Sequence, residues 1–220
     1  MKKNKSFLIL LVILLGTNSA YSEEALQSSN IKRPVYTLTP EIGSTSFHVV
    51  GLDSKYISGS SIGTSVRFTT AEPSLSWSIG AQYFQTGLKK TFDLGIFSID
   101  LAKVKMDYLG LPIKAEYLIN HQTENKVNYY FNAGATPAYL LSANQQALYG
   151  DDTKEHGIRS AMNGFDMLLN AGMGGRYVTD LGVMEASFEY NHGLFNVDKE
   201  SKNSTKNEGF IAKIGYVISM

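Results

Sequence analysis

The chain has 220 residues, and its 20 Lys and Arg are balanced by 20 Asp and Glu, which argues against a nucleic-acid partner. Charged residues make up 18% of the chain, which is low beside the roughly 25% of a soluble domain, and the absence of Cys excludes disulfides. A mean hydropathy of −0.12 excludes a bundle of transmembrane helices but not a membrane β-barrel, because only alternate residues of a barrel strand face lipid.

The N-terminal segment has the features of a secretory signal peptide. A positively charged start, Met1–Lys5, precedes the unbroken apolar run Phe7–Gly16, and small residues follow up to Ala20 and Ser22, where cleavage is expected. The apolar run is too short to cross ~30 Å of hydrocarbon comfortably. We therefore expect export through the Sec pathway and divide the chain into a signal peptide (1–22), a short periplasmic lead (23–34) and one domain (35–220).

Within that domain, apolar and polar residues alternate with the period of two that is typical of β-strands. The clearest segment, Ser74–Thr86, sets Trp77 and Tyr83 on an apolar face against a face of Ser, Gly and Gln. The pattern predicts eight strands, at 36–44, 58–69, 74–86, 104–119, 126–142, 163–177, 183–191 and 209–219.

A soluble β-sandwich would show the same alternation, so periodicity alone leaves both architectures open. Two features favour a membrane barrel. The polar faces are rich in Gly, Ser and Asn, which suits a narrow interior. Aromatic residues lie near the expected strand ends, where interfacial girdles belong; these are Tyr83, Tyr117, Tyr129, Tyr177 and Tyr190.

The connections between the expected strands alternate strictly between long and short. In chain order they are 45–57, 70–73, 87–103, 120–125, 143–162, 178–182 and 192–208. Outer-membrane barrels have short periplasmic turns and longer extracellular loops. We therefore expect an eight-stranded antiparallel up-and-down transmembrane β-barrel in the outer membrane of a Gram-negative bacterium, with both termini in the periplasm.

The segment from Tyr108 to Tyr117, YLGLPIKAEY, resembles a strand motif of the PorT-like outer-membrane β-barrel proteins. Tyr108, Pro112 and Tyr117 carry the resemblance, and the flanking segments Ser74–Gly87 and Asn128–Leu141 are similar to the neighbouring strands of that family. The resemblance implies a barrel over residues 36–220 and assigns no activity. The chain ends in Tyr216–Met220, without the terminal aromatic residue that the barrel assembly machinery reads in many outer-membrane proteins.

Nine charged residues fall on the polar faces and are expected inside the barrel: Glu41, Arg67, Lys114, Glu116, Asp166, Arg176, Glu185, Glu189 and Lys213. Since eight strands enclose only enough room for side chains, these charges must be paired and hydrogen-bonded. We interpret them as a structural network that fills the lumen. The alternatives are a proton or ion path and a catalytic dyad.

No local pattern indicates catalysis. Some eight-stranded outer-membrane barrels modify lipids with His and Ser, but His192 is followed by Gly193 and Leu194 rather than by a Ser two residues away. Ser187 or Asn191 remains a candidate catalytic partner for His192, because either could approach it across the barrel wall. The loop residues Asp151, Asp152, Glu155 and His156 are interpreted as solvated rather than metal-binding.

We therefore expect no enzyme, cofactor or metal. The expected role is structural or surface-interacting, through long extracellular loops. The expected partners are outer-membrane lipid, the barrel assembly machinery and an extracellular partner bound by those loops. Three alternatives remain: a narrow channel or an accessory of outer-membrane transport or secretion, a lipid-modifying enzyme, and a soluble lipocalin-like carrier.

Overall fold

The computed structural model describes residues 36–52, 54–70, 72, 74–93, 98–119, 126–149, 152–199, 201 and 204–219. The expected signal peptide (1–22) and lead (23–34) lie outside these residues. The strands are β1 (Tyr36–Val50), β2 (Ile57–Thr69), β3 (Leu75–Asp93), β4 (Ser98–Gly110), β5 (Ile113–Leu118), β6 (Val127–Tyr149), β7 (Asp152–Gly157), β8 (Phe165–Thr179), β9 (Gly182–Gly193) and β10 (Lys206–Ser219), and a single 3-10 turn, η1, spans Arg159–Ala161. No helix among the described residues is long and apolar enough to cross a bilayer.

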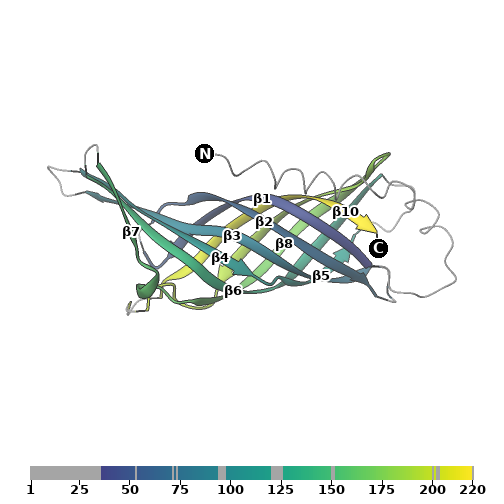
Figure 1. Ribbon diagram of the computed structural model, residues 1–220. Helices are drawn as coiled ribbons and strands as arrows, with labels where there is room; N and C mark the ends of the chain where they lie inside the picture. Colours follow the sequence, from purple (N-terminus) through teal and green to yellow (C-terminus); the bar gives the residue numbers. More distant parts are fainter. Residues whose placement is uncertain are drawn as a thin grey trace.

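The strands close into an antiparallel barrel (Figure 1). Each wall strand pairs with its neighbour in the chain, and β1 pairs with both β2 and β10, which closes the ring. β4 and β5 together form the fourth wall strand, because both pair with β3 on one side and with β6 on the other. The wall therefore has eight strands, which confirms the expected fold.

The structure has ten strands instead of the expected eight, because one wall strand is interrupted and one further strand is added outside the wall. β4 and β5 are separated at Leu111 and Pro112, where proline has no N–H to donate to the ladder. The backbone oxygen of Pro112 still accepts a hydrogen bond from the N–H of Gly80, at 2.9 Å. The addition is β7, which pairs with the last residues of β6 and lies outside the closed ring.

The predicted loops at 87–103 and 143–162 were too long, because the strands continue through much of them. β3 runs to Asp93 and pairs with β4 from Ser98, while β6 continues to Tyr149 and folds back as β7. Similarly, β1 continues past Ser44 to Val50, with Thr45, Phe47 and Val49 buried inside the wall. In these extensions the apolar side chains, such as Phe47, Val49 and Leu88, lie on the inward face, whereas in the rest of the wall they lie on the outer face. This change of phase hid the extensions from a pattern that assumes one fixed apolar face.

The barrel thus has two different ends. The turn end carries the short connections 70–74, 119–126 and 180–181 together with Ser219, and the loop end carries the longer structure. Figure 1 shows β3, β4, β6 and β7 reaching out at the left, opposite the C terminus. Ten residues of β3 lie beyond Tyr83; at ~3.3 Å per residue and a tilt of about 40°, the extension rises about 25 Å.

The outer face of the wall is apolar, as expected for strands in lipid. Ile79, Ile113, Phe131 and Leu169 are 46 to 51% exposed, while their strand neighbours point inward. Aromatic side chains border this band; Trp77, Tyr117, Tyr129 and Tyr177 lie toward the turn end, and Tyr83, Tyr139, Phe165 and Tyr190 lie toward the loop end. The ten residues from Tyr129 to Tyr139 span about 25 Å along the barrel axis, the height of the apolar band of outer-membrane barrels.

Candidate functional site

The candidate site is the interior of the barrel, which the wall strands line with every second residue. All nine charged residues that the alternation assigned to the lumen have their side chains there. Seven are buried and two, Glu41 and Arg176, are half-buried. They come from six strands: β1 (Glu41), β2 (Arg67), β5 (Lys114, Glu116), β8 (Asp166, Arg176), β9 (Glu185, Glu189) and β10 (Lys213).

Four of these residues form a closed ring of alternating charges near the turn end, which we call the arginine–glutamate ring. Arg67 donates from Nε to Oε2 of Glu116 at 2.8 Å and from Nη2 to Oε2 of Glu185 at 2.7 Å. Arg176 donates from Nε to Oε2 of Glu185 at 2.7 Å and from Nη2 to Oε2 of Glu116. Because two guanidinium groups face two carboxylates, the ring has no net formal charge.

Tyr130 of β6 completes the ring from one side. Its hydroxyl donates to Oε1 of Glu185 at 2.8 Å, and the guanidinium carbon of Arg176 lies 4.2 Å from the centre of its ring. Gly174 of β8 leaves the space for this tyrosine, since a Cβ atom at Gly174 would lie 2.3 Å from the Tyr130 hydroxyl oxygen. Tyr130 therefore orients both a carboxylate and a guanidinium.

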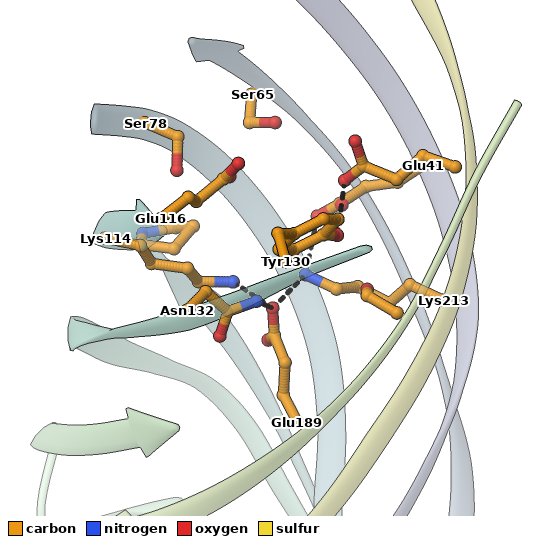
Figure 2. A pocket seen from close by; sticks show the side chains of 12 residues that line it. Glu41, Ser65, Ser78, Lys114, Glu116, Tyr130, Asn132, Glu189 and Lys213 are labelled. Atoms are coloured by element: carbon orange, nitrogen blue, oxygen red, sulfur yellow. Dashed lines mark hydrogen bonds and ion pairs between the residues drawn. The ribbon is translucent and has the colours of Figure 1, made fainter. Parts of the chain in front are cut away.

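A second cluster, the lysine–glutamate chain, lies further from the turn end. Oε1 of Glu189 accepts from Nζ of Lys114 at 2.5 Å and from Nζ of Lys213 at 3.2 Å. Lys213 also contacts Oε1 of Glu41 at 3.2 Å, and the amide of Asn132 donates to Glu189 at 3.4 Å. Figure 2 shows these side chains converging across the lumen from opposite walls. Two ammonium groups again match two carboxylates.

Asp166 lies apart from both clusters, toward the loop end. Its Oδ1 accepts backbone N–H bonds from Met167 at 2.8 Å and from Phe195 at 3.3 Å. Its Oδ2 accepts from the amide of Asn207 at 3.0 Å, and the same amide donates to the hydroxyl of Tyr108 at 3.3 Å. Asp166 therefore anchors the 194–205 connection rather than joining the ion pairs.

Between the ring and the chain lies a small cavity, bordered by Lys114, Glu116, Tyr130 and Ser187 among others. The cavity has a volume of about 20 Å³, which is room for one water molecule. The buried Oδ1 of Asn132, which also lines the cavity, has no hydrogen-bond partner within the protein. A water molecule in this cavity would satisfy that amide oxygen, and the cavity is too small for an organic ligand.

Toward the loop end the lumen is filled by apolar side chains. The buried cluster contains Val49, Phe84, Leu88, Val104, Met106, Tyr108, Ala138, Leu140, Ala143, Leu168 and Val197. Phe84 and Tyr108 stack with ring centres 5.5 Å apart. Val197 lies between β9 and β10; its N–H donates to the backbone oxygen of Thr205 and its C=O accepts from the N–H of Asn163, which holds Val197 in this cluster.

The three residues of the strand motif have different positions. Tyr108 is buried in the apolar cluster, Pro112 lies at the interruption between β4 and β5, and Tyr117 is 57% exposed on the outer face. The motif therefore contributes to the core, to the interruption of a wall strand and to the turn-end aromatic girdle.

Sequence reasoning missed three polar partners in the lumen, Tyr130, Asn132 and Asn207. Tyr130 and Asn132 share the inward parity of Lys114 and Glu116 across the β5–β6 register, so the same alternation could have found them. Asn207 lies within the predicted loop 192–208, where no strand was expected. The prediction was restricted to charged side chains, although buried amide and hydroxyl groups also need hydrogen-bond partners.

A row of polar side chains on the outer face was also missed. Glu208 of β10 lies between His48 of β1 and His192 of β9; Nε2 of His48 is 3.7 Å from Oε1 and Nδ1 of His192 is 3.3 Å from Oε2. Because successive strand residues face opposite sides, Ser187 and Asn191 point into the lumen while His192 points outward, so neither can act as its partner. Within the described residues, no three His, Cys, Asp or Glu side chains are placed to hold a metal ion.

Among solved structures the chain is similar to Neisserial surface protein A (TM-score 0.44, 14% identity, 83% of this chain and 96% of that one) and to Ail, the attachment invasion locus protein of Yersinia pestis (TM-score 0.39, 16% identity, 83% and 98%). It is also similar to the outer membrane protease OmpT of Escherichia coli (TM-score 0.44, 9% identity, 88% and 99%). At these TM-scores none of the three bears on the role of this chain.

The search of curated proteins found no match. The model of one family, described as outer membrane protein beta-barrel domain, matches residues 27–199, which is most of the chain. With the closed eight-stranded wall and its apolar outer band, this match shows that the chain belongs to the outer membrane protein beta-barrel domain family and is a small outer-membrane β-barrel.

Proposed function

We propose that this protein is a sealed outer-membrane barrel that holds a projecting β-sheet at the cell surface for contact with an external partner. The observation that carries the proposal is the extension of β3, β4, β6 and β7 about 25 Å beyond the loop-end aromatic girdle. Paired strands of this length are more rigid than loops and present a defined surface.

The proposal places the turn end in the periplasm and the loop end outside the cell. It is supported by the short turns at one end and the extended hairpins at the other, the asymmetry of outer-membrane barrels. Since the chain has no Cys, single cysteines can test it. We expect Lys55→Cys to react with a membrane-impermeant maleimide on intact cells, and Leu181→Cys to react only after the outer membrane is permeabilised. The opposite pattern would reverse the orientation.

The structure offers little support for the alternative of a narrow channel. The lumen is crossed by two neutral ion clusters and is then filled by apolar side chains, including Val197 from the segment between β9 and β10. An ion would have to displace paired charges and then cross the apolar cluster, which is costly. We expect the purified barrel to show no discrete conductance steps in a planar lipid bilayer; reproducible single-channel steps would favour the channel.

The proposal assigns no catalytic activity to the barrel. His192 has a carboxylate beside it, but no Ser or Thr hydroxyl is among its hydrogen-bond partners in the described chain, and a hydrolytic nucleophile must lie within such reach. Unaltered lipid A acylation in cells that lack the protein is the expected result. A changed acylation pattern that is restored by the wild type would support a lipid-modifying enzyme instead.

The surface role is tested by shortening the β3–β4 hairpin. Gly87 and Lys105 are paired across the two strands, so replacing residues 88–104 with Asn-Gly joins them through a two-residue turn. We expect cells that display this variant to lose most of the gain in cell–cell aggregation, or in adhesion to epithelial cells, that the wild type confers. The matched control carries a short insertion at Leu181 in the opposite, turn end.

All variants are compared at equal amounts of folded barrel, measured by the heat-dependent shift in gel migration. If the wild type confers no gain over barrel-free cells in either assay, or if the shortened variant retains the gain, the surface role is contradicted.

Within its family, we infer that the chain groups with the PorT-like barrels. The inference is supported by the motif residues Tyr108, Pro112 and Tyr117, which have three distinct structural roles in the wall strand formed by β4 and β5. A PorT-like barrel in which the proline does not interrupt the corresponding strand would count against this grouping.

A further inference from the structure

Four lysines share one outward face at the base of the projecting sheet, and we call them the lysine face: Lys55, Lys89, Lys103 and Lys105. Lys55 and Lys89 form an isolated antiparallel bridge, with N–H to O distances of 2.8 and 3.2 Å in the two directions. Lys89 is directly paired with Lys103 on β4. Directly paired residues have Cβ atoms only about 5 Å apart, so the ammonium groups are held together by the register of the backbone.

The alternation of β4 shows which way these side chains point. Val104 and Met106 are 6% and 0% exposed inside the wall, so Lys103 and Lys105 face outward. On β3, Leu88 is buried inside and Lys89 faces outward in the same way. The lysine face is therefore on the side of the wall that continues downward into the lipid-facing apolar band.

The nearest carboxylate on this face is already occupied. Oδ1 of Asp107 accepts hydrogen bonds from the hydroxyl of Tyr83 at 2.8 Å and from the amide of Gln85 at 2.9 Å, and Oδ2 accepts from the hydroxyl of Ser142 at 2.5 Å. Asp107 is thus held by three neutral donors, and Lys105, two residues away on β4, interacts with it favourably through space without forming an ion pair. Among the residues whose side chains the structure describes, no carboxylate lies within ion-pair distance of the lysine face.

The height of the lysine face above the membrane is set by the strand register. Lys105 lies four residues beyond Leu109, and Lys89 and Lys103 lie six residues beyond Tyr83 and Leu109, which are paired at the loop-end girdle. With ~3.3 Å per residue and a tilt of about 40°, the ammonium-bearing residues are about 10 to 15 Å above that girdle. Lysine side chains can also bend back toward the interface.

We propose that the lysine face binds the phosphorylated headgroup of a lipid in the outer leaflet, whose acyl chains lie against the apolar wall below it. Clustered ammonium groups, of which only Lys105 has a described carboxylate nearby, complement phosphate. The apolar band that begins at Tyr83 and Leu109, below Asp107, complements the acyl chains. The placement in the outer leaflet rests on the orientation proposed above, whereas the binding chemistry does not.

The test uses the full barrel in detergent, with native mass spectrometry to count bound lipid during titration with lipid A that carries both phosphates. We expect one tightly bound lipid A on the wild type. Lys55→Gln, Lys89→Gln, Lys103→Gln and Lys105→Gln, combined in one variant, should weaken binding by at least about tenfold, the equivalent of one charged hydrogen bond. The matched control replaces the same four lysines with arginine and should bind within about threefold of the wild type, because the charges remain.

Two further ligands separate phosphate recognition from other causes. Dephosphorylated lipid A should bind the wild type no better than lipid A binds the glutamine variant. Inorganic phosphate should displace lipid A only in large excess, since it lacks the acyl chains.

Equal binding by the wild type and the glutamine variant, or equal binding of the dephosphorylated lipid, would overturn the proposal. Displacement by equimolar inorganic phosphate would make this a free-phosphate site and would overturn the assignment to lipid. If the combined variant fails the heat-shift test for folding, Lys103→Gln and Lys105→Gln are tested singly. Each should weaken the binding of lipid A about two- to threefold. No effect from either substitution would count against the proposal. Reversed cysteine labelling on cells would contradict the orientation but leave this binding result intact.

Discussion

The substitution Glu185→Gln removes one corner of the arginine–glutamate ring. Glu185 accepts from Arg67 at 2.7 Å, from Arg176 at 2.7 Å and from the hydroxyl of Tyr130 at 2.8 Å. The substitution keeps the shape of the side chain but removes its charge. Two guanidinium groups then face the single carboxylate of Glu116, and the buried cluster acquires one uncompensated positive charge.

The cost follows from the burial of the ring. Removing one partner of a buried ion pair typically destabilises a protein by about 3 to 5 kcal/mol, because the remaining charge is left without compensation. Glu185 is 9% exposed and Arg67 is 7% exposed, so bulk water screens them little. The adjacent cavity can hold a water molecule that partly solvates the freed guanidinium, so we expect the lower end of the range, about 3 kcal/mol.

The free energy of unfolding can be measured by urea titration of the barrel in lipid vesicles, with tryptophan fluorescence as the signal. Trp77 is the one tryptophan of the chain, and it is 46% exposed on the outer face near the turn end. Its emission therefore reports the transfer of the wall from lipid to water. Refolding from urea must reach the same curve before the values are compared.

The double variant Glu185→Gln with Arg67→Gln provides the control, since it leaves the balanced pair Arg176 and Glu116. We expect it to be destabilised by at least about 1 kcal/mol less than the sum of the two single variants, as residues within one ion network are coupled. If Glu185→Gln is within about 1 kcal/mol of the wild type, or if the two single effects simply add, the ring does not stabilise the barrel in the way described.

Three further substitutions test other parts of the interior in the same unfolding assay. Tyr130→Phe should cost about 1.5 to 3 kcal/mol, because Glu185 loses a charged hydrogen bond while the aromatic ring stays; no loss would show that the hydroxyl is dispensable. Gly174→Ala should lower the free energy of unfolding by about 1 to 3 kcal/mol, since its Cβ would overlap the Tyr130 hydroxyl. Gly175→Ala, whose Cβ would have its nearest neighbour at 3.5 Å, should be nearly neutral. Equal effects of the two substitutions would refute this packing. Leu140→Ala should cost about 2 to 5 kcal/mol as a cavity in the apolar cluster, and Leu140→Met less than about 1.5 kcal/mol; an alanine variant as stable as the methionine variant would contradict tight packing there.

The local alternation of apolar and polar residues was sufficient to predict which side chains of the wall strands face inward and which face outward. Trp77, Ile79, Ser76 and Ser78 face the sides that the period of two assigned to them, because a strand allows only two directions for a side chain. The same parity assigned Asp166 to the lumen with the other charges. The eight-strand count followed from the turns, since turn residues interrupt the alternation.

The lengths of the strands and the partners of the lumen charges depended on the tertiary structure. The continuation of β3 to Asp93 and of β6 to Tyr149 is stabilised by pairing between strands. Beyond the loop-end girdle the apolar residues, such as Leu88 and Leu140, lie on the inner face instead of the outer one, so the alternation in the sequence changes phase. The alternation shows which face a side chain lies on, but it does not show how far along the barrel axis that residue lies. Glu185 pairs with Arg67, which is 118 residues away in the chain, whereas Asp166 forms none of the ion pairs among the described residues. Both facts follow from the closure of the barrel and the stagger of its strands.

The sequence by itself therefore determined the fold class, through the alternation of long and short connections, and which residues enter the lumen, through the geometry of a single strand. Only the tertiary structure decided how the lumen charges divide into two neutral clusters, that the loop end is closed by apolar side chains, and that four lysines lie together on the outer wall. Those features depend on register between strands, which is set by the closed ring as a whole and is not written in any one segment.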